Sequence, residues 1–125
     1  MLSPDPNAAL ARLRDICLAL PDTDEIVSHG ATAFRVHGKM FAYFQHNHHG
    51  DGLTVVSVKT TGREEQDLLL EVDPELYSWP AYIGPRGWIA MSLAPEETDW
   101  AHIAARVATS HALAAPKRRG HQAPG

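Results

Sequence analysis

The hydrophobic period changes near residue 32, and this change constrains the fold more than any other feature of the chain. Apolar residues recur at helical spacing over residues 7–20. Beyond that point the period is two, with one alternating run at 34–36 and a second at 40–44. His37-Gly38 separates the two runs and suits a tight turn, because glycine readily takes a positive φ. The pattern therefore predicts a helix followed by a β-hairpin.

The middle of the chain predicts a strand and then a short helix. Residues 53–59 are rich in β-branched side chains, which favour an extended strand. Residues 63–72 have acidic residues in their first turn, where they suit the positive end of a helix dipole. This helix is expected to bury Leu68, Leu69 and Val72.

The C-terminal half predicts two more strands and a last helix. Pro80 and Pro85 restrict the segment around them to an edge strand or a loop, and residues 88–93 predict a buried strand. The last helix is expected to start near Thr98 as N-cap and to end near Ala115. The element order is then α-β-β-β-α-β-β-α, and hairpin connections make the sheet mainly antiparallel. The predicted class is α+β, with helices packed on the sheet.

The 125 residues have room for one domain with a substantial core. That domain is predicted to span residues 1–115, and residues 116–125 form a basic tail that is expected to be disordered. No apolar run approaches the roughly 18 residues that a membrane span needs. The N-terminus also lacks the basic start and apolar stretch of a signal peptide, so a cytoplasmic location and no membrane contact are expected.

Charge is unevenly distributed along the chain. The formal net charge is −4, but Lys117, Arg118 and Arg119 lie together near the C-terminus. Without these three residues, 8 basic residues face 15 acidic ones, a formal charge of −7. Any contact with nucleic acid would therefore need a local basic patch, for which the tail is the obvious candidate.

Two side chains with reactive potential are explained by packing. Cys17, the single cysteine, cannot form an internal disulfide and lies on the apolar stripe of the first helix. It is predicted to be a small buried hydrophobe rather than a nucleophile. His111 lies on an apolar helix face and is predicted to be a satisfied histidine at the core boundary.

A run of histidines after the hairpin is a candidate metal site. His46, His48, His49 and Asp51 are all permitted ligands. Structural zinc sites, however, usually take ligands from two separated segments, and a catalytic site needs supporting groups that a glycine-containing loop supplies badly. The run is interpreted as a hydrated loop, and no cofactor is expected.

The sequence offers no catalytic constellation. No histidine pairs convincingly with a serine or cysteine, and the glycines around residue 84 lack the spacing of a phosphate-binding loop. The clustered carboxylates fall at helix starts, where capping and dipole effects account for them. A non-enzymatic protein is therefore expected.

Several cations lie among aromatic residues. Lys39 is close to Phe41 and Tyr43, Lys59 ends a predicted strand, and Arg86 directly precedes Gly87-Trp88. Cations bind phosphates, and aromatic faces can stack on bases. The alternative is that the lysines are solubilising charges at strand ends and that Trp88 belongs to the core.

A succession of short motifs resembles the MmcQ/YjbR family of small bacterial proteins. The motifs, in order, are LALP (18–21), HG (29–30), AFRV (33–36), GKMFA (38–42), SVK (57–59), GPRGW (84–88) and APKR (115–118). The resemblance implies an α-β-β-β-α-β-β-α fold similar to that of secretion chaperones. It also implies a DNA-binding role through a "double-wing" motif, with Lys39, Lys59 and Trp88 at the matching positions.

Two hypotheses for the function follow. In the first, hairpin wings that carry Lys39 and Lys59 approach DNA phosphates, and Arg86, Trp88 and the basic cluster at 117–119 add further contacts. In the second, the chain is a small protein- or ligand-binding module, possible as a homodimer, that does not bind nucleic acid. An enzyme is the least supported class.

Overall fold

One six-stranded sheet organises the described chain, in the spatial order β1-β2-β3-β4-β6-β5 with antiparallel neighbours throughout. The computed structural model describes residues 6–47, 52–93 and 98–116. The elements are α1 (Pro6–Leu18), β1 (Thr23–Ser28), β2 (Ala31–Val36), β3 (Lys39–His46), β4 (Thr54–Lys59), α2 (Arg63–Val72), β5 (Tyr77–Ser78), η2 (Gly84–Arg86), β6 (Trp88–Ser92) and α3 (Trp100–Ala114).

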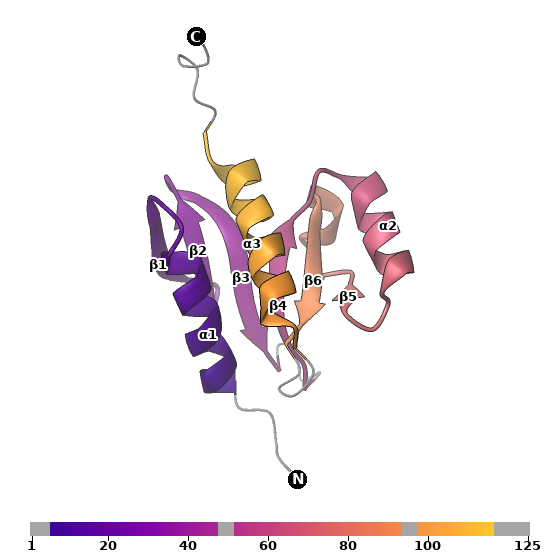
Figure 1. Ribbon diagram of the computed structural model, residues 1–125, viewed down its shortest axis with the longest axis horizontal. Coiled ribbons are helices and arrows are strands. Elements are labelled where there is room, and N and C mark those ends of the chain that lie inside the picture. Colours follow the sequence, from indigo (N-terminus) through magenta and orange to yellow (C-terminus); the bar gives the residue numbers. More distant parts are fainter. Residues whose placement is uncertain (1–5, 48–51, 94–97, 117–125) are drawn as a thin grey trace.

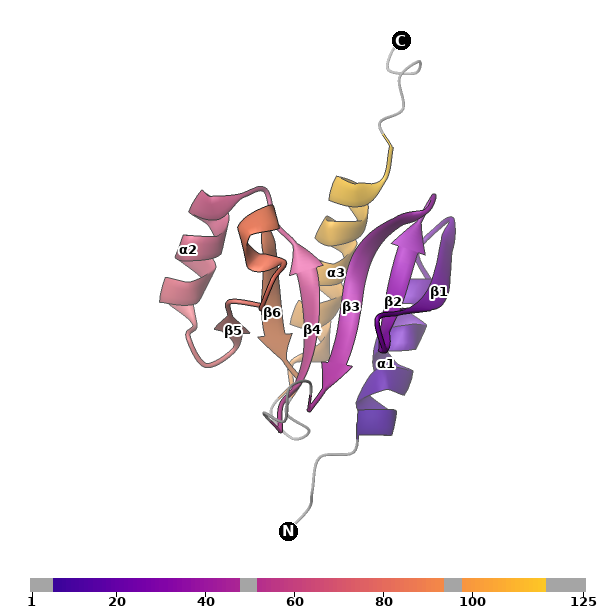
Figure 2. The same cartoon turned by 180° about the vertical axis from the view of Figure 1, so that it is seen from behind.

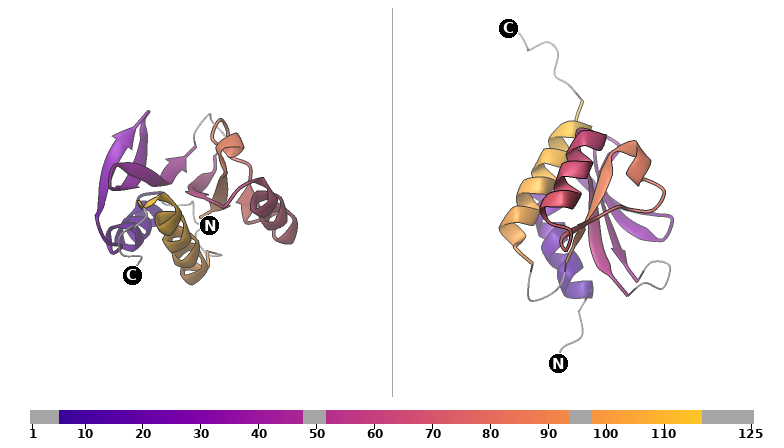
Figure 3. Two further views of the ribbon diagram at one scale, coloured as in Figure 1. Left: turned by 90° about the horizontal axis from the view of Figure 1, so that it is seen from above. Right: turned by 90° about the vertical axis from the view of Figure 1, so that its right-hand side faces the viewer.

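The helices are distributed unequally around this sheet. α1 and α3 lie side by side over one face, and the sheet curves around them (Figures 1 and 3). α2 lies beyond the edge formed by β6 and β5. The opposite face of β2, β3 and β4 carries no helix (Figure 2). The apolar core therefore lies between the sheet and the α1–α3 pair.

The core is built from alternate residues of the central strands. Ala42, Val58 and Ile89 are register partners across β3, β4 and β6, and all are fully buried. They pack in one cluster with buried residues of the two covering helices, among them Leu13, Ile103 and Val107. Side chains on the intervening strand positions point to the face without helices, as the period of two requires.

Tight turns connect the first three strands. His29-Gly30 joins β1 to β2 with φ values of 52° and 80°, and His37-Gly38 joins β2 to β3 with 49° and 80°. Two successive residues with positive φ match the twist of antiparallel strands, and glycine takes the second position without steric cost. The turn predicted at residues 37–38 is confirmed.

A bulge near the start of β3 turns one more aromatic residue toward the helices. Phe34 pairs with Ala42 and Arg35 pairs with Met40, so Phe41 is the extra residue. Its side chain is fully buried, and its ring meets that of His111 on α3 edge to face at 5.2 Å. The Nε2 atom of His111 donates to the Pro21 carbonyl at 2.9 Å, which confirms the prediction of a satisfied boundary histidine.

The predicted class and element order are confirmed, with one addition and three local corrections. The structure adds β1, which forms an edge of the sheet ahead of the predicted hairpin. α3 begins one residue later than predicted, because Asp99 rather than Thr98 caps it by accepting from the His102 N–H at 3.2 Å. On α2, Leu68 and Val72 are exposed, and Gln66 is the buried residue.

Cys17 is fully buried in the core cluster, and burial raises the pKa of its thiol to about 12. The folded protein should therefore fail to react with a disulfide reagent such as DTNB at pH 8, whereas protein unfolded in urea should react at once. Because the folded pKa is raised, the stabilisation linked to the neutral thiol is complete below about pH 8.5 and is lost as the pH rises toward 12. A thiol that reacts rapidly in the native protein would contradict this burial.

Candidate nucleic-acid interface

Three of the predicted cationic residues lie at one end of the sheet. Lys39 begins β3, Lys59 ends β4, and Arg86 lies two residues before the start of β6. Because these neighbouring strands are antiparallel, the start of β3, the end of β4 and the start of β6 share one sheet end, uppermost in Figure 1. We call Lys39, Lys59 and Arg86 together the basic end.

Lys59 and Trp88 are brought together by the sheet register. The two residues are direct partners across β4 and β6, and the Lys59 Nζ lies 5.2 Å from the centre of the Trp88 ring. Trp88 is only 6% exposed, and its ring also lies 5.1 Å from that of Tyr43. Trp88 thus supports the lysine by a cation–π contact and offers little surface for a base to stack on.

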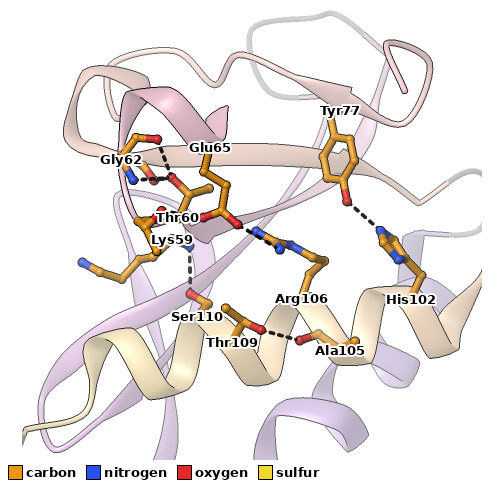
Figure 4. A network of polar contacts seen from close by, with 12 residues as sticks. Lys59, Thr60, Gly62, Glu65, Tyr77, His102, Ala105, Arg106, Thr109 and Ser110 are labelled. Carbon is orange, nitrogen blue, oxygen red and sulfur yellow. Dashed lines mark hydrogen bonds and ion pairs between the residues drawn. The ribbon is translucent and has the colours of Figure 1, made fainter. Parts of the chain in front are cut away.

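A buried serine of α3 fixes the backbone beside Lys59. The Ser110 Oγ accepts from the Lys59 N–H at 2.8 Å and donates to the Phe41 carbonyl at 2.6 Å (Figure 4). Ser110 is fully buried, so these hydrogen bonds join α3, β3 and β4 where water is excluded. Ser110 follows the buried Val107 by three residues and so lies on the apolar face of α3. This spacing is the sequence signal that could have revealed its role.

The segment that carries Arg86 and Trp88 is attached to α2. The Gln66 Nε2 donates to the carbonyls of Gly84 and Trp88, both at 2.7 Å. The Thr60 Oγ1, just after Lys59, donates to the carbonyl of Gly87 at 2.8 Å. These contacts hold the 84–88 segment against β4 and α2, and so fix the position of the basic end.

The cations of the basic end have no carboxylate partner among the described residues. Four other arginines are ion-paired, namely Arg14 with Glu25, Arg35 with Asp24, Arg63 with Asp67 and Arg106 with Glu65. Hydrogen bonds from the arginine partners lower the pKa of the Glu25 and Asp24 carboxyls. Arg12 is the other described arginine or lysine without an ion pair among the described residues, and it lies over Trp100 at the opposite end of α3. Cations without a carboxylate partner therefore gather at the basic end, although the exposed carboxylates of Asp22, which contacts His37, and Glu64 also lie there.

One detail of the predicted wings needs correction. Lys39 directly follows the β2–β3 turn and does lie on a hairpin tip. Lys59 does not, because β4 is followed by α2 and β5 before the chain returns to pair as β6. Lys59 is half-buried against Trp88, so it is a fixed cation rather than one on a projecting loop.

The remaining candidate residues are separate from this end or lie outside the described chain. Lys117, Arg118 and Arg119 fall outside the described residues, which end at Pro116 just beyond α3. His48 and His49 also lie outside. His46, at the other end of β3, has its Nδ1 atom 2.7 Å from the Thr54 Oγ1. Within residues 6–47, 52–93 and 98–116 no group of three histidine, cysteine or acidic side chains could hold a metal.

A second polar cluster, not anticipated from the sequence, lies between α3 and the α2–β5 edge. The Tyr77 hydroxyl is 2.6 Å from the His102 Nε2, and the Arg106 Nη1 donates to Glu65 at 3.3 Å (Figure 4). Burial raises the pKa of the Tyr77 hydroxyl. The pKa of the Glu65 carboxyl is lowered, chiefly because the carboxylate accepts a hydrogen bond from the Thr61 N–H. His102, Arg106 and Ser110 follow one another at intervals of four residues, so they lie on the same face of α3. The cluster joins α2 to the domain.

These features define a small α+β domain with a helix-covered antiparallel sheet and a cationic sheet end. The family model described as YjbR matches residues 18–113, and the chain belongs to the YjbR family. The crystal structure of Deinococcus radiodurans protein DR2400, with a DUF419 domain, is similar with a TM-score of 0.69 and 19% identity, covering 90% of this chain and 81% of that one. At that identity the likeness shows the fold alone. No curated protein matches the chain. None of the described helices is long and apolar enough to cross a membrane.

Proposed function

We propose that the chain is a nucleic-acid-binding module that contacts backbone phosphates through the basic end. The observation that carries the proposal is the concentration there of cations without carboxylate partners, while four other arginines are neutralised locally. Family membership agrees with a domain of this architecture. The module acts by binding rather than by catalysis.

The geometry favours phosphate contact over base reading. Lys39 and Arg86 are exposed. Lys59 ends β4, the strand between β3 and β6, and is half-buried against Trp88. Lysine and arginine contacts to phosphate position a protein on nucleic acid but carry little sequence information. Since Trp88 is buried, the aromatic part of the site stabilises Lys59 and does not stack on bases. Weak discrimination between sequences follows.

The chain as a whole repels nucleic acid at a distance, because its formal charge is −4. Glu64, exposed in the first turn of α2, also lies at this end of the sheet. Binding must therefore depend on a few close contacts and be sensitive to salt. Three phosphate contacts predict a slope of log K against log salt of about −2.7, and three more from residues 117–119 would bring it to about −5.

Fluorescence anisotropy of a labelled DNA duplex, titrated from low to physiological salt, tests the proposal. The double substitution Lys39→Ala and Arg86→Ala should weaken binding at low salt and make the salt slope shallower by about 2. Both side chains are exposed, so the fold should be unaffected.

Arg12→Ala is the matched control, because Arg12 also lacks an ion pair among the described residues but lies away from the basic end. It should leave the affinity and the slope unchanged. An equal loss in the Arg12 variant would mean that only total charge matters. Loss confined to a triple alanine variant at 117–119 would assign binding to the tail, and no binding at low salt would refute the proposal.

A further inference from the structure

An apolar groove separates the end of α2 from the start of α3, away from the basic end (Figure 1). Its volume is about 400 Å³, and its apolar lining comes from α2, α3 and the segment that leads to β5, namely Leu69, Val72, Leu76 and Ile103. Val72 is 69% exposed. The groove therefore offers apolar surface that the described chain leaves open.

The rim of this groove is acidic. Asp73 and Asp99 line it and are exposed, and the exposed Glu71 and Glu75 lie on either side of Asp73 in the sequence. Asp73 is the C-cap of α2, so these carboxylates lie at the negative end of the helix dipole, where a cation is stabilising and an anion is not. No lysine or arginine occurs in the sequence between residues 63 and 86. The segment that forms this rim thus carries negative charge that it does not balance itself.

The cations of the neighbouring helices do not pair with this rim. Arg106, on the side of α3 that faces α2, is paired with Glu65 in the first turn of α2. Arg12 lies over the ring of Trp100 and has no ion pair among the described residues. An apolar groove with free carboxylates on its rim suits a segment that combines an apolar side chain with cations, because complementary charge selects the partner.

The chain itself contains such a segment, at the end of α3. Leu113 is 40% exposed, and it follows Arg106 by two helical turns, so it lies on the side of α3 that faces α2. Beyond Pro116 the sequence continues with Lys117, Arg118 and Arg119, which lie outside the described residues. In the whole sequence no other lysines or arginines are adjacent to one another.

The basic cluster of one chain falls short of that chain's own groove. The groove lies at the start of α3, whereas the cluster follows its end. α3 has 15 residues and is therefore about 22 Å long. The three residues from Pro116 to Arg119 span at most about 10 Å when fully extended. A groove on another copy of the chain is the one that this cluster can meet.

An antiparallel pair of α3 helices would bring groove and cluster together. Small exposed side chains form the outward face of α3 at intervals of four, three and four residues, namely Ala101, Ala105, Ala108 and Ala112. The distance between packed helices depends on the side chains at the contact, so a face of methyl groups permits close approach. When two copies pack on this face about a two-fold axis, the end of each α3 lies beside the start of the other.

We infer that the groove binds the end of α3 and the basic cluster of a second copy of this chain, in a two-fold dimer. Leu113 of the second copy packs on the apolar lining, and its residues 117–119 meet the carboxylates of Asp73 and Asp99. Both grooves of the dimer are filled in the same way, so the assembly is closed. The groove lies away from the basic end, and this inference does not depend on phosphate binding.

Sedimentation velocity of the full chain over a series of concentrations tests the inference. At low salt the wild type should sediment with twice the mass of one chain and should dissociate on dilution. Added salt should weaken the dimer, because it screens the contacts between the cluster and the rim. A wild type that stays monomeric at the highest concentration would overturn the inference and leave the groove to a basic segment of another protein.

Asp73→Asn and Glu64→Gln form a matched pair on the same helix. Asp73→Asn removes the charge but keeps an oxygen that can accept from the Leu76 N–H, so the fold should be unaffected. It should weaken dimerisation about tenfold, because each dimer contains two grooves and loses the contact twice. Glu64→Gln removes an exposed carboxylate from the first turn of α2 and should leave dimerisation unchanged. An equal change in both variants would show that net charge alone governs association, and the inference would be wrong.

An exchange of charge between groove and cluster is the decisive experiment. One variant carries Asp73→Lys, and the other carries glutamate in place of Lys117, Arg118 and Arg119. Each variant alone should be monomeric at concentrations where the wild type is dimeric, because its groove and its cluster have charge of the same sign. An equimolar mixture should form a heterodimer, since each groove then meets a cluster of opposite charge. A mixture that stays monomeric, or a dimer that persists in either variant alone, would refute the assignment of the cluster to this groove.

Discussion

Trp88→Ala should lower the free energy of unfolding by about 3–5 kcal/mol, the range for truncating a buried aromatic side chain. Trp88 is 6% exposed, and its ring contacts that of Tyr43 and supports the Lys59 ammonium group. Small domains are stable by only about 5–15 kcal/mol, so the variant should retain little of its stability. Urea unfolding followed by circular dichroism would show the loss as a lower midpoint with an unchanged slope.

Trp88→Phe is the control for this change. It keeps an aromatic ring in the same site and should recover much of the lost stability, since the cavity is smaller. A melting temperature that barely moves in Trp88→Ala would contradict the burial of the ring. It would also favour the alternative, considered from the sequence, that Trp88 is an exposed ring on which bases stack rather than a core residue.

The sequence predicts the position of Lys39 in the site but not the contact between Lys59 and Trp88. The alternation of strands and the glycine after His37 placed Lys39 beside a hairpin turn correctly. The contact of Lys59 with Trp88, however, depends on the pairing of β4 with β6 across an intervening helix and strand. Register between strands so distant in the chain is decided by tertiary packing, which local periodicity does not report.

The added strand β1 illustrates a different limit. Thr23–Ser28 contains Asp24 and Glu25 and lies at the sheet edge, where it has one strand neighbour. Both carboxylates are ion-paired, to Arg35 on the neighbouring strand and to Arg14 on α1. Charged residues are common on edge strands, because they discourage pairing with other chains. The same charges remove the alternation by which a strand is recognised in the sequence.

The bulge in β3 is a third case. Strict alternation would direct Phe41 to the same face as Tyr43, but the extra residue turns Phe41 toward α3. No glycine or proline in residues 39–46 signals this irregularity. Contacts made by α3, through the His111 ring and the Ser110 hydroxyl, stabilise the bulge after the chain has folded.

Gln66→Met should lower the free energy of unfolding more than Leu68→Ala does, which is the opposite of what the hydrophobicity of the two side chains predicts. By hydrophobicity, Leu68 belongs to the buried face of α2 and Gln66 to the surface. In the structure Leu68 is 57% exposed, whereas Gln66 is 2% exposed and donates to the Gly84 and Trp88 carbonyls. Methionine has a similar volume but no donor, so the Gln66 variant leaves two buried acceptors short of a hydrogen bond.

The expected cost of Gln66→Met is about 2 kcal/mol, because the Gly84 carbonyl still accepts from the Gly87 N–H. Leu68→Ala should cost about 0.5 kcal/mol or less, as is usual for an exposed site. Thermal unfolding of both variants beside the wild type measures the difference. A large loss in Leu68→Ala would mean that this face of α2 is covered in solution by another chain. A neutral Gln66→Met would mean that α2 does not hold the 84–88 segment, and the basic end would then lack the rigid support that keeps Arg86 and Lys59 in place.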